Sequence, residues 1–201
     1  MQRKMIFVVF VLGFAATLFG QSTVGASERS SAAFEADFPA GSLLLLHVRS
    51  GDVRLLGGDQ DKIVVRYEGA NADRGREVRV TLVRSGQTGD LSIHGGPHND
   101  FRIVVQVPRR LNLKVRMPFG NLVISAIAGD KDVEVHAGDV TLEIGQSAQY
   151  AHVDLSVSSG ELSAGTFGVE KAGLFRSFET KGTGSYRLHA HLGAGDLTIK
   201  N

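Results

Sequence analysis

The sequence predicts an all-β, single-domain protein built as a β-solenoid or β-helix-like stack of short strands, preceded by a signal-peptide helix. Three observations predict this class. A short glycine phrase recurs six times, polar and apolar residues alternate along most of the chain, and no segment after the first 26 residues has helical spacing. A length of 201 residues fits one domain with its own core.

The first 26 residues have the three parts of a secretory signal peptide. Two basic residues precede an apolar run from Met5 to Gly20, and small residues end the segment at Ala26. The run is shorter than the roughly 20 residues that a membrane-spanning helix needs. We therefore predict cleavage after Ala26, with a retained anchor as the alternative. Residues 27–33 are predicted to form a flexible leader, followed by a β domain over 34–201.

The recurring phrase predicts a turn that begins a strand. It consists of a glycine, an acidic or amide residue and an aliphatic residue that starts an alternating run. Glycine supplies positive φ at turns, and Asp or Asn bonds the nearby backbone. The predicted structural turn glycines are Gly51, Gly89, Gly120, Gly138, Gly160 and Gly195. Their spacing of 18 to 38 residues indicates stacked passes with a shared core. Its irregularity leaves a β-sandwich of hairpins as the alternative.

The strands between these turns show the period of two that marks one buried and one wet face. Gly-rich segments such as 85–89 and 95–99 separate them. In chain order, the predicted strands include 43–49, 62–68, 77–84, 102–107, 111–117, 132–136, 153–157 and 186–190.

Composition excludes several classes of protein. With 22 Lys and Arg against 21 Asp and Glu and no basic cluster, nothing indicates a nucleic-acid binder. The chain has no Cys, which excludes a disulfide framework, a thiolate metal site and a cysteine nucleophile. No second long apolar run occurs, so we expect no stable transmembrane span after processing.

Two sets of residues invite a metal interpretation. The acids of the phrase would form a cation-binding ladder if they stacked, but the strict calcium-binding repeat is absent and we expect each acid to cap its own turn. His189 and His191 share a strand face, and His94 and His98 flank a turn, whereas zinc needs three or four ligands. The sequence thus predicts no metal site and no cofactor. The acids are Asp52, Asp90, Asp139, Glu161 and Asp196.

No catalytic residue is predicted either. The chain has no Gly-x-Ser-x-Gly elbow and no phosphate-binding loop ending in Gly-Lys-Ser/Thr. A polysaccharide-acting β-helix enzyme would need an acid cluster beside basic residues. Four basic residues would serve there, or would form the wet face of alternating strands: Arg79, Arg102, Lys114 and Arg116.

An ordered set of motifs resembles a known family. The set runs from Phe38-Pro39-Ala40-Gly41-Ser42 through Val107-Pro108 and Phe119-Gly120-Asn121-Leu122 to the terminal Gly195-Asp196-Leu197. It is similar to the bacterial "putative adhesin" domain-of-unknown-function family, over about residues 34–201. Arg109-Arg110 departs from the family pattern, where a small turn residue is more usual, and Met117-Pro118 before the third phrase is also unusual. The resemblance implies Gly-Asp-rich, β-solenoid-like envelope proteins and carries over no catalytic residue.

These observations together predict a non-catalytic exported structural or interaction protein of the bacterial envelope, in the periplasm, on the outer surface or secreted. The expected partner is an envelope protein or a carbohydrate. The alternatives are a sensory or regulatory module acting through a membrane partner and, below it, a polysaccharide-acting enzyme. The last strand runs to Asn201 without a cap, so self-association through that terminal edge is also expected.

Overall fold

The computed structural model describes residues 33–201, and this range is built almost entirely of β-strands. The predicted signal-peptide helix (1–26), the cleavage site after Ala26 and all but the last residue of the leader (27–33) lie outside the described residues. Helix is limited, in the described range, to three short 3-10 segments. These are η1 (Ala72–Glu77), η2 (Ser147–Gln149) and η3 (Gly165–Phe167). The prediction of an all-β fold with little helix is confirmed.

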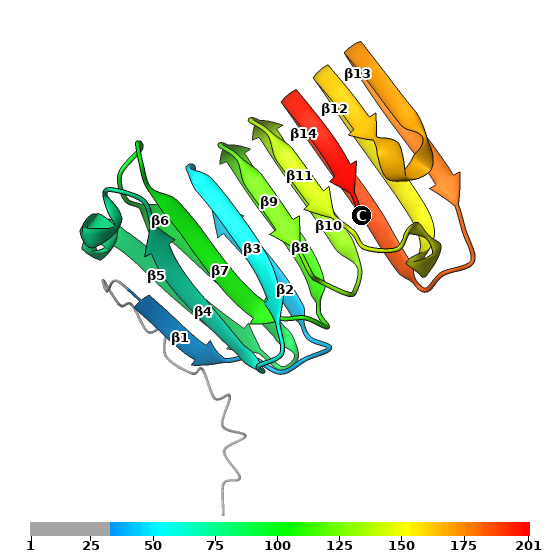
Figure 1. The fold of residues 1–201 in the computed structure, drawn as a ribbon. Coiled ribbons are helices and arrows are strands. Elements are labelled where there is room, and N and C mark those ends of the chain that lie inside the picture. Colours follow the sequence, from blue (N-terminus) through cyan, green and yellow to red (C-terminus); the bar gives the residue numbers. More distant parts are fainter. Residues whose placement is uncertain (1–32) are drawn as a thin grey trace, which may run out of the picture.

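The central strands form a coil in which each pass adds one strand to each of two sheet faces (Figure 1). The pass made by β2 (Leu43–Val48) and β3 (Asp52–Gly58) pairs in parallel with β8 (Asn112–Phe119) and β9 (Leu122–Ser125). That pass pairs with β10 (Lys131–Ala137) and β11 (Val140–Glu143). Two long strands, β14 (Tyr186–Lys200) and then β12 (Tyr150–Ala164), continue the stack and each cross from one face to the other.

Other strands complete the two ends of the stack. Beyond β2 and β3 lie β6 (Thr88–Gly95) and β7 (Arg102–Pro108), also parallel. Antiparallel strands close this end: β5 (Val78–Ser85), β4 (Lys62–Glu68) and β1 (Ala33–Asp37). At the other end, β13 (Val169–Lys181) runs antiparallel to β12. Parallel passes thus occupy the middle of the sheet, and antiparallel strands occur at both ends.

We call the face that contains β5, β6, β2, β8, β10 and the first halves of β14 and β12 the first face. The second face contains β1, β4, β7, β3, β9, β11 and the second halves of the same long strands. One apolar core fills the space between them. In β10, Val133 and Val135 point into this core, whereas Asp132, Glu134 and His136 point outward. The period-two pattern therefore determines which side chains lie on the outer surface of each face.

Five of the six predicted turn glycines meet at one corner between the faces. Gly51, Gly120, Gly138, Gly195 and Gly160 follow one another across the stack, with φ between +122° and +138°. A Cβ on Gly138 would lie 1.9 Å from the carbonyl oxygen of Gly120, and one on Gly160 would lie 1.9 Å from that of Gly195. At Gly120, Gly138, Gly195 and Gly160 the neighbouring backbone comes too close for any side chain.

The prediction of a turn at Gly89 was wrong. Gly89 lies inside β6, and the turn comes earlier, at Gly86, where φ is +58°. A Cβ on Gly89 would lie 2.4 Å from Cε2 of Phe38, which is fully buried. This glycine makes room for an aromatic ring of the core. At this position the glycine of the phrase is therefore needed for side-chain packing and not for a turn.

The expectation of an open edge at the last strand was also wrong. β14 pairs with β10 and β11 on one side and with β12 on the other. The chain passes through β12 and β13 before β14 inserts into the gap that they leave. The outermost strand at this end is β13, whose one described partner is β12.

Candidate ligand-binding face

The outer surface of the first face carries most of the histidines in the described part of the chain, together with charged residues. Strand alternation directs these side chains outward from neighbouring strands. They are His94 of β6, His47 of β2, Lys114 and Arg116 of β8, Asp132, Glu134 and His136 of β10, His189 and His191 of β14, and His152 and Asp154 of β12.

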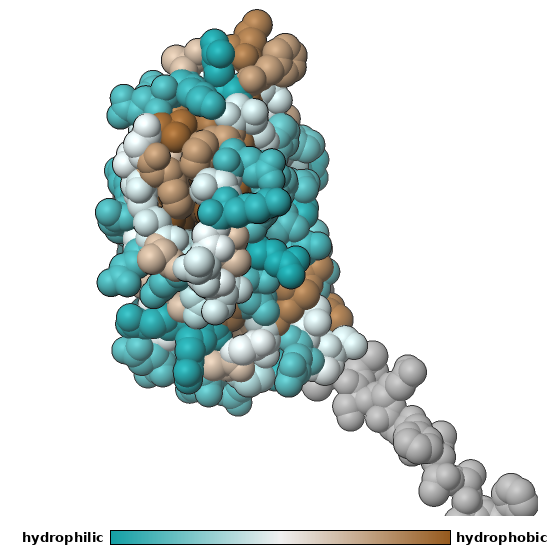
Figure 2. All heavy atoms as spheres, turned by 90° about the vertical axis from the view of Figure 1, so that its right-hand side faces the viewer, coloured by the Kyte–Doolittle hydropathy of each residue, from teal (hydrophilic) through white to brown (hydrophobic). Residues whose placement is uncertain are grey.

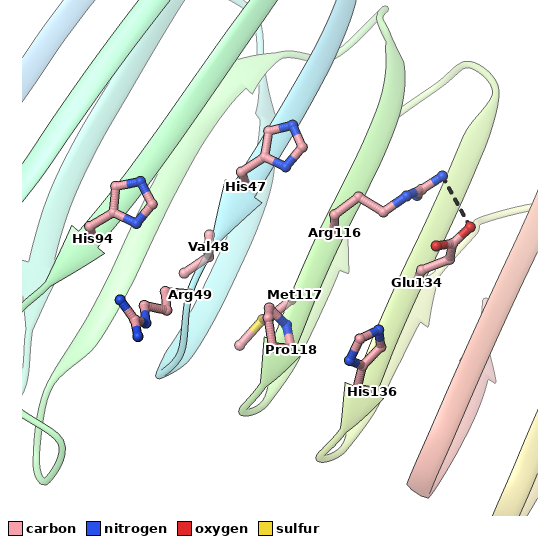
Figure 3. A pocket seen from close by; sticks show the side chains of 9 residues that line it. All are labelled: His47, Val48, Arg49, His94, Arg116, Met117, Pro118, Glu134 and His136. Carbon is pink, nitrogen blue, oxygen red and sulfur yellow. Dashed lines mark ion pairs between the residues drawn. The ribbon is translucent and has the colours of Figure 1, made fainter.

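A hollow of about 320 Å³ opens on this face beside the glycine corner (Figure 3). Its volume lies at the lower end of the range for small-molecule sites. Histidines and arginines from four neighbouring strands, β6, β2, β8 and β10, surround it, and Val48, Met117 and Pro118 supply apolar atoms. The lining residues are His47, Val48, Arg49, His94, Arg116, Met117, Pro118, Glu134 and His136.

Arg116 is held in place by several acceptors. Its Nη2 lies 3.0 Å from Asp132 and 3.2 Å from Oε1 of Glu134, and its Nη1 donates to the carbonyl oxygen of Val115 at 2.8 Å. Burial by itself would raise the pKa of the Asp132 carboxyl, but the hydrogen bonds and charges of Arg116 and Lys114 bring that pKa below its ordinary value. This network fixes Arg116 and neutralises the acids at the edge of the hollow.

The other basic side chains of the hollow have fewer partners. Nε2 of His47 lies 3.8 Å from a carboxylate oxygen of Asp90, just inside the limit of about 4 Å for an ion pair. The side chains of Arg49, His94 and His136 are exposed and make no hydrogen bond or ion pair within the described residues. These groups are available to a ligand.

A second cluster on the same face has the composition of a metal site. Ligand atoms of Asp132, Glu134 and His189 all lie within 4.8 Å of one another, and Nδ1 of His189 lies 3.0 Å from Oδ2 of Asp154. The guanidinium of Arg116 already bridges both carboxylates of the cluster. A cation would have to displace it, so the arrangement favours a salt-bridge network.

The acidic and amide residues of the glycine phrase form a ladder along the corner. Nδ2 of Asn121 donates to Asp52 at 2.9 Å, and Oδ1 of Asn121 accepts from the backbone N–H of Asp139 at 3.1 Å. Oδ1 of Asp139 accepts from the N–H of Asp196, and Oδ1 of Asp196 accepts from the N–H of Glu161. These side chains therefore bond to the turn of the neighbouring pass. The sequence had suggested instead that each acid caps its own turn.

The structure separates other residues that the sequence grouped. Asp90 lies on the first face within β6, where it accepts from Ser92, and takes no part in the corner ladder. Lys114 and Arg116 lie on the first face, whereas Arg102 of β7 lies on the second face beside Glu68. His189 and His191 do share the first face, with Asp154 and Ser156 as partners.

Sequence reasoning missed the hollow. His47 and Arg49 read as ordinary polar positions near the end of one predicted strand, and His136 as one at the end of another. The pairing of β2 with β8 and of β8 with β10 brings them together. The signal that was present is that each is a basic side chain within a few residues of a phrase glycine, Gly51 or Gly138.

Comparison with known proteins gives a likeness in fold. The crystal structure of a putative cell adhesion protein from Clostridium sporogenes matches 84% of this chain and 98% of its own, at 15% identity and a TM-score of 0.52. A putative adhesin from Bacteroides fragilis matches 83% and 96%, at 10% identity and a TM-score of 0.32. No protein-family model and no curated protein matches the sequence. The first likeness shows a shared fold.

No helix within residues 33–201 has the length and apolar character needed to span a membrane.

Proposed function

We propose that this protein is an exported, non-catalytic, adhesin-like interaction protein of the bacterial envelope, which binds its partner through the outer surface of the first face. The observation that carries the proposal is the convergence of outward histidine and arginine side chains around one hollow of a sheet. The names of the fold neighbours, a cell adhesion protein and an adhesin, agree with it.

The fold gives this face the rigidity that recognition requires. Parallel pairing on both sides holds β2, β8 and β10, and the glycine corner holds their ends. A surface that is ordered before binding loses little conformational entropy when a partner docks. The stack therefore acts as a scaffold for its outward side chains.

The proposed export rests on the start of the chain. The basic start, the apolar run and the small residues before Ala26 are typical of a secretory signal. The absence of Cys in the whole sequence is compatible with an oxidising compartment but does not require one.

The charges of the face support a binding role over catalysis. A carboxyl that acts as a general acid at neutral pH needs a raised pKa. The Asp132 carboxyl has a lowered pKa beside Arg116, and Glu134 is bridged by the same guanidinium. This pair is therefore unsuited to the acid step of glycan cleavage.

A second candidate function is an envelope sensory module that acts through a membrane partner. It is favoured by β13, a 13-residue strand whose far side has no partner in the described structure. An extended segment of a membrane protein would add to such an edge by backbone hydrogen bonds.

The test combines location with a binding assay. Protease treatment of intact cells, and of cells with an opened outer membrane, locates the native protein, and sequencing its amino terminus shows whether residues 1–26 are removed. Recovery in the cytoplasm with Met1 retained would overturn the proposal. Purified protein is then added to isolated cell envelopes.

Two tryptophan variants identify the binding surface. Ser92→Trp places a bulky neutral group on the first face beside His47, and Thr141→Trp does the same on the second face. We expect Ser92→Trp to weaken envelope binding about tenfold or more and Thr141→Trp to leave it unchanged. Equal effects of the two variants would place the binding surface elsewhere.

A further inference from the structure

We infer that the hollow on the first face binds the anionic group of an acidic glycan, a carboxylate or a sulfate, through Arg49 and the histidines His47, His94 and His136. This inference rests on the proposed function and specifies its ligand. The four side chains come from β6, from β2 and the residue just after it, and from β10, so the strand pairing assembles the site.

Arg49 is the permanent charge of the site. It lies just past the end of β2, and its exposed guanidinium makes no hydrogen bond or ion pair within the described residues. A guanidinium presents a planar set of N–H donors that matches a carboxylate or sulfate with two parallel hydrogen bonds. An anion entering the hollow would give Arg49 the partner that it lacks.

Arg116 offsets the negative charge of the acids around the site and does not itself bind the ligand. Its two terminal nitrogens are engaged by Asp132, Glu134 and the carbonyl of Val115. Together with Lys114, whose Nζ lies 3.5 Å from Asp132, it balances the charge of the two carboxylates nearest the hollow. The acids therefore do not repel an incoming anion. The remaining carboxylate in reach is Asp90, which faces His47 at 3.8 Å.

The same geometry disfavours a metal. The group of metal-ligand atoms within 4.8 Å of one another in the described chain is Asp132, Glu134 and His189, and it does not include His47, His94 or His136. The histidines of the hollow are therefore spread around a larger ligand. Arg49 also repels a cation at that place.

The form of the hollow favours a sugar over an acidic protein. A stable protein interface spreads over about 800 Å² on each partner. A hollow of about 320 Å³ instead has the volume of a small-molecule site. Its apolar atoms come from Val48, Met117 and Pro118, between the basic side chains. A sugar ring that bears an acidic group offers C–H groups to such a floor and its charge to the basic residues.

Three histidines make the proposed binding dependent on pH. Imidazole rings gain positive charge as the pH falls from 7.5 to 5.5. Asp90 and Arg116 face His47 across the strands, Arg79 of β5 is the register partner of His94, and Glu134 precedes His136 on its own strand. We expect tighter binding at the lower pH.

The test is calorimetry of the purified protein at pH 5.5 and 7.5 and constant ionic strength. The probes are oligogalacturonate for carboxylates, heparin oligosaccharides for sulfates, and neutral dextran oligosaccharides. We expect one or both acidic probes to bind, at least fivefold more tightly at pH 5.5, and dextran not to bind. The comparison of the two acidic probes identifies the anionic group.

Matched variants place the binding in the hollow. Arg49→Gln should weaken binding about tenfold at both pH values, and His136→Gln should reduce the difference between them. Arg187→Gln removes an exposed arginine at the opposite end of β14 from the corner and should change nothing. Circular dichroism checks that each variant is folded.

Three outcomes would overturn the inference: equal binding of dextran, wild-type affinity in Arg49→Gln, or an equal loss in Arg187→Gln, which would indicate charge attraction alone. Envelope binding that survives Arg49→Gln but is lost in Ser92→Trp would reject the anion site and retain the proposed function. A cytoplasmic protein whose hollow binds the acidic probes would reject the proposed function and retain the site.

Discussion

At the scale of single residues, the glycine corner is where the sequence is most constrained. The φ of Gly51 is +122° and that of Gly138 is +137°, values that L side chains rarely adopt. The two positions differ in their surroundings. A Cβ on Gly51 would meet nothing within 4 Å, whereas one on Gly138 would lie 1.9 Å from a backbone oxygen of Gly120. Substitutions at these two positions therefore distinguish the cost of backbone strain from the cost of a clash with the neighbouring backbone.

We expect Gly51→Ala to lower the free energy of unfolding by about 1–3 kcal/mol, from backbone strain alone. Gly138→Ala should cost a further 1–3 kcal/mol or so, because two passes of the coil must separate to admit the methyl group. Urea denaturation of both variants measures the difference. Equal losses of unfolding free energy in the two variants would show that the neighbouring passes separate at Gly138 without cost.

A buried lysine gives the fold a pH-dependent stability. Lys131 is 2% exposed, and its Nζ donates to the hydroxyl of Tyr150 at 2.7 Å and to the carbonyl of Gly129 at 3.1 Å. Burial lowers the pKa of this amine from 10.5 to about 8. Between these values the unfolded chain holds the proton more strongly than the folded protein, so stability should rise with pH.

The expected gain between pH 8 and 9.5 is about 2 kcal/mol, since each pKa unit corresponds to about 1.4 kcal/mol. Lys131→Met should abolish this rise, whereas Lys114→Met, on the exposed side of β8, should retain it. Urea midpoints at the two pH values provide the measurement. A rise that persists in Lys131→Met would assign it to other groups.

At the scale of elements, β13 closes the end of the stack with charged as well as apolar side chains on the core side of the sheet. Its register sets Lys171 opposite Leu162 and Arg176 opposite Val157, two core residues of β12. Nζ of Lys171 donates to the carbonyl of Ser177 at 2.7 Å. Figure 2 shows this side of the molecule, where hydrophilic surface surrounds smaller hydrophobic areas. Charged residues that point inward from this edge strand hinder its pairing with the same strand of a second copy.

We therefore expect the double variant Lys171→Val, Arg176→Val to associate end to end, because the exposed side of the core would become apolar. Sedimentation velocity from about 5 to 200 μM should show dimers or larger species for this variant, with the wild type monomeric. The control Glu179→Val, Lys181→Val also removes two charges, but from residues whose register partners Asp154 and His152 point outward. Association of the control to the same extent would contradict the role given to β13.

At the scale of the whole molecule, the sequence predicted which segments form strands better than it predicted which strands and side chains lie next to one another. Alternation located the strands because one core serves two sheet faces, and the phrase located five corner glycines because backbones meet there. Gly89 carries the same phrase yet packs against Phe38, a difference that depends on a distant contact. The hollow was beyond prediction, since His47, Arg49 and His136 become neighbours through pairings between passes far apart in the chain.

The position of β14 leads to a last prediction about the whole fold. This strand ends the chain but lies inside the stack, with β10 and β11 on one side and β12 on the other. Five of its residues, Leu188, Ala190, Leu192, Leu197 and Ile199, are buried in the core. Removing it would leave β12 and β13 with no contact to the remaining passes through the sheet.

Truncation after Ser185 should therefore abolish cooperative thermal unfolding, although it removes only a chain end. Adding the separate peptide of residues 186–201 should restore the transition, because its backbone groups and apolar side chains complete both faces at once. A peptide with Leu192 and Leu197 changed to Asp keeps its length and should fail to restore it. A truncated protein that melts like the full chain would show that the passes are stable without their shared strand.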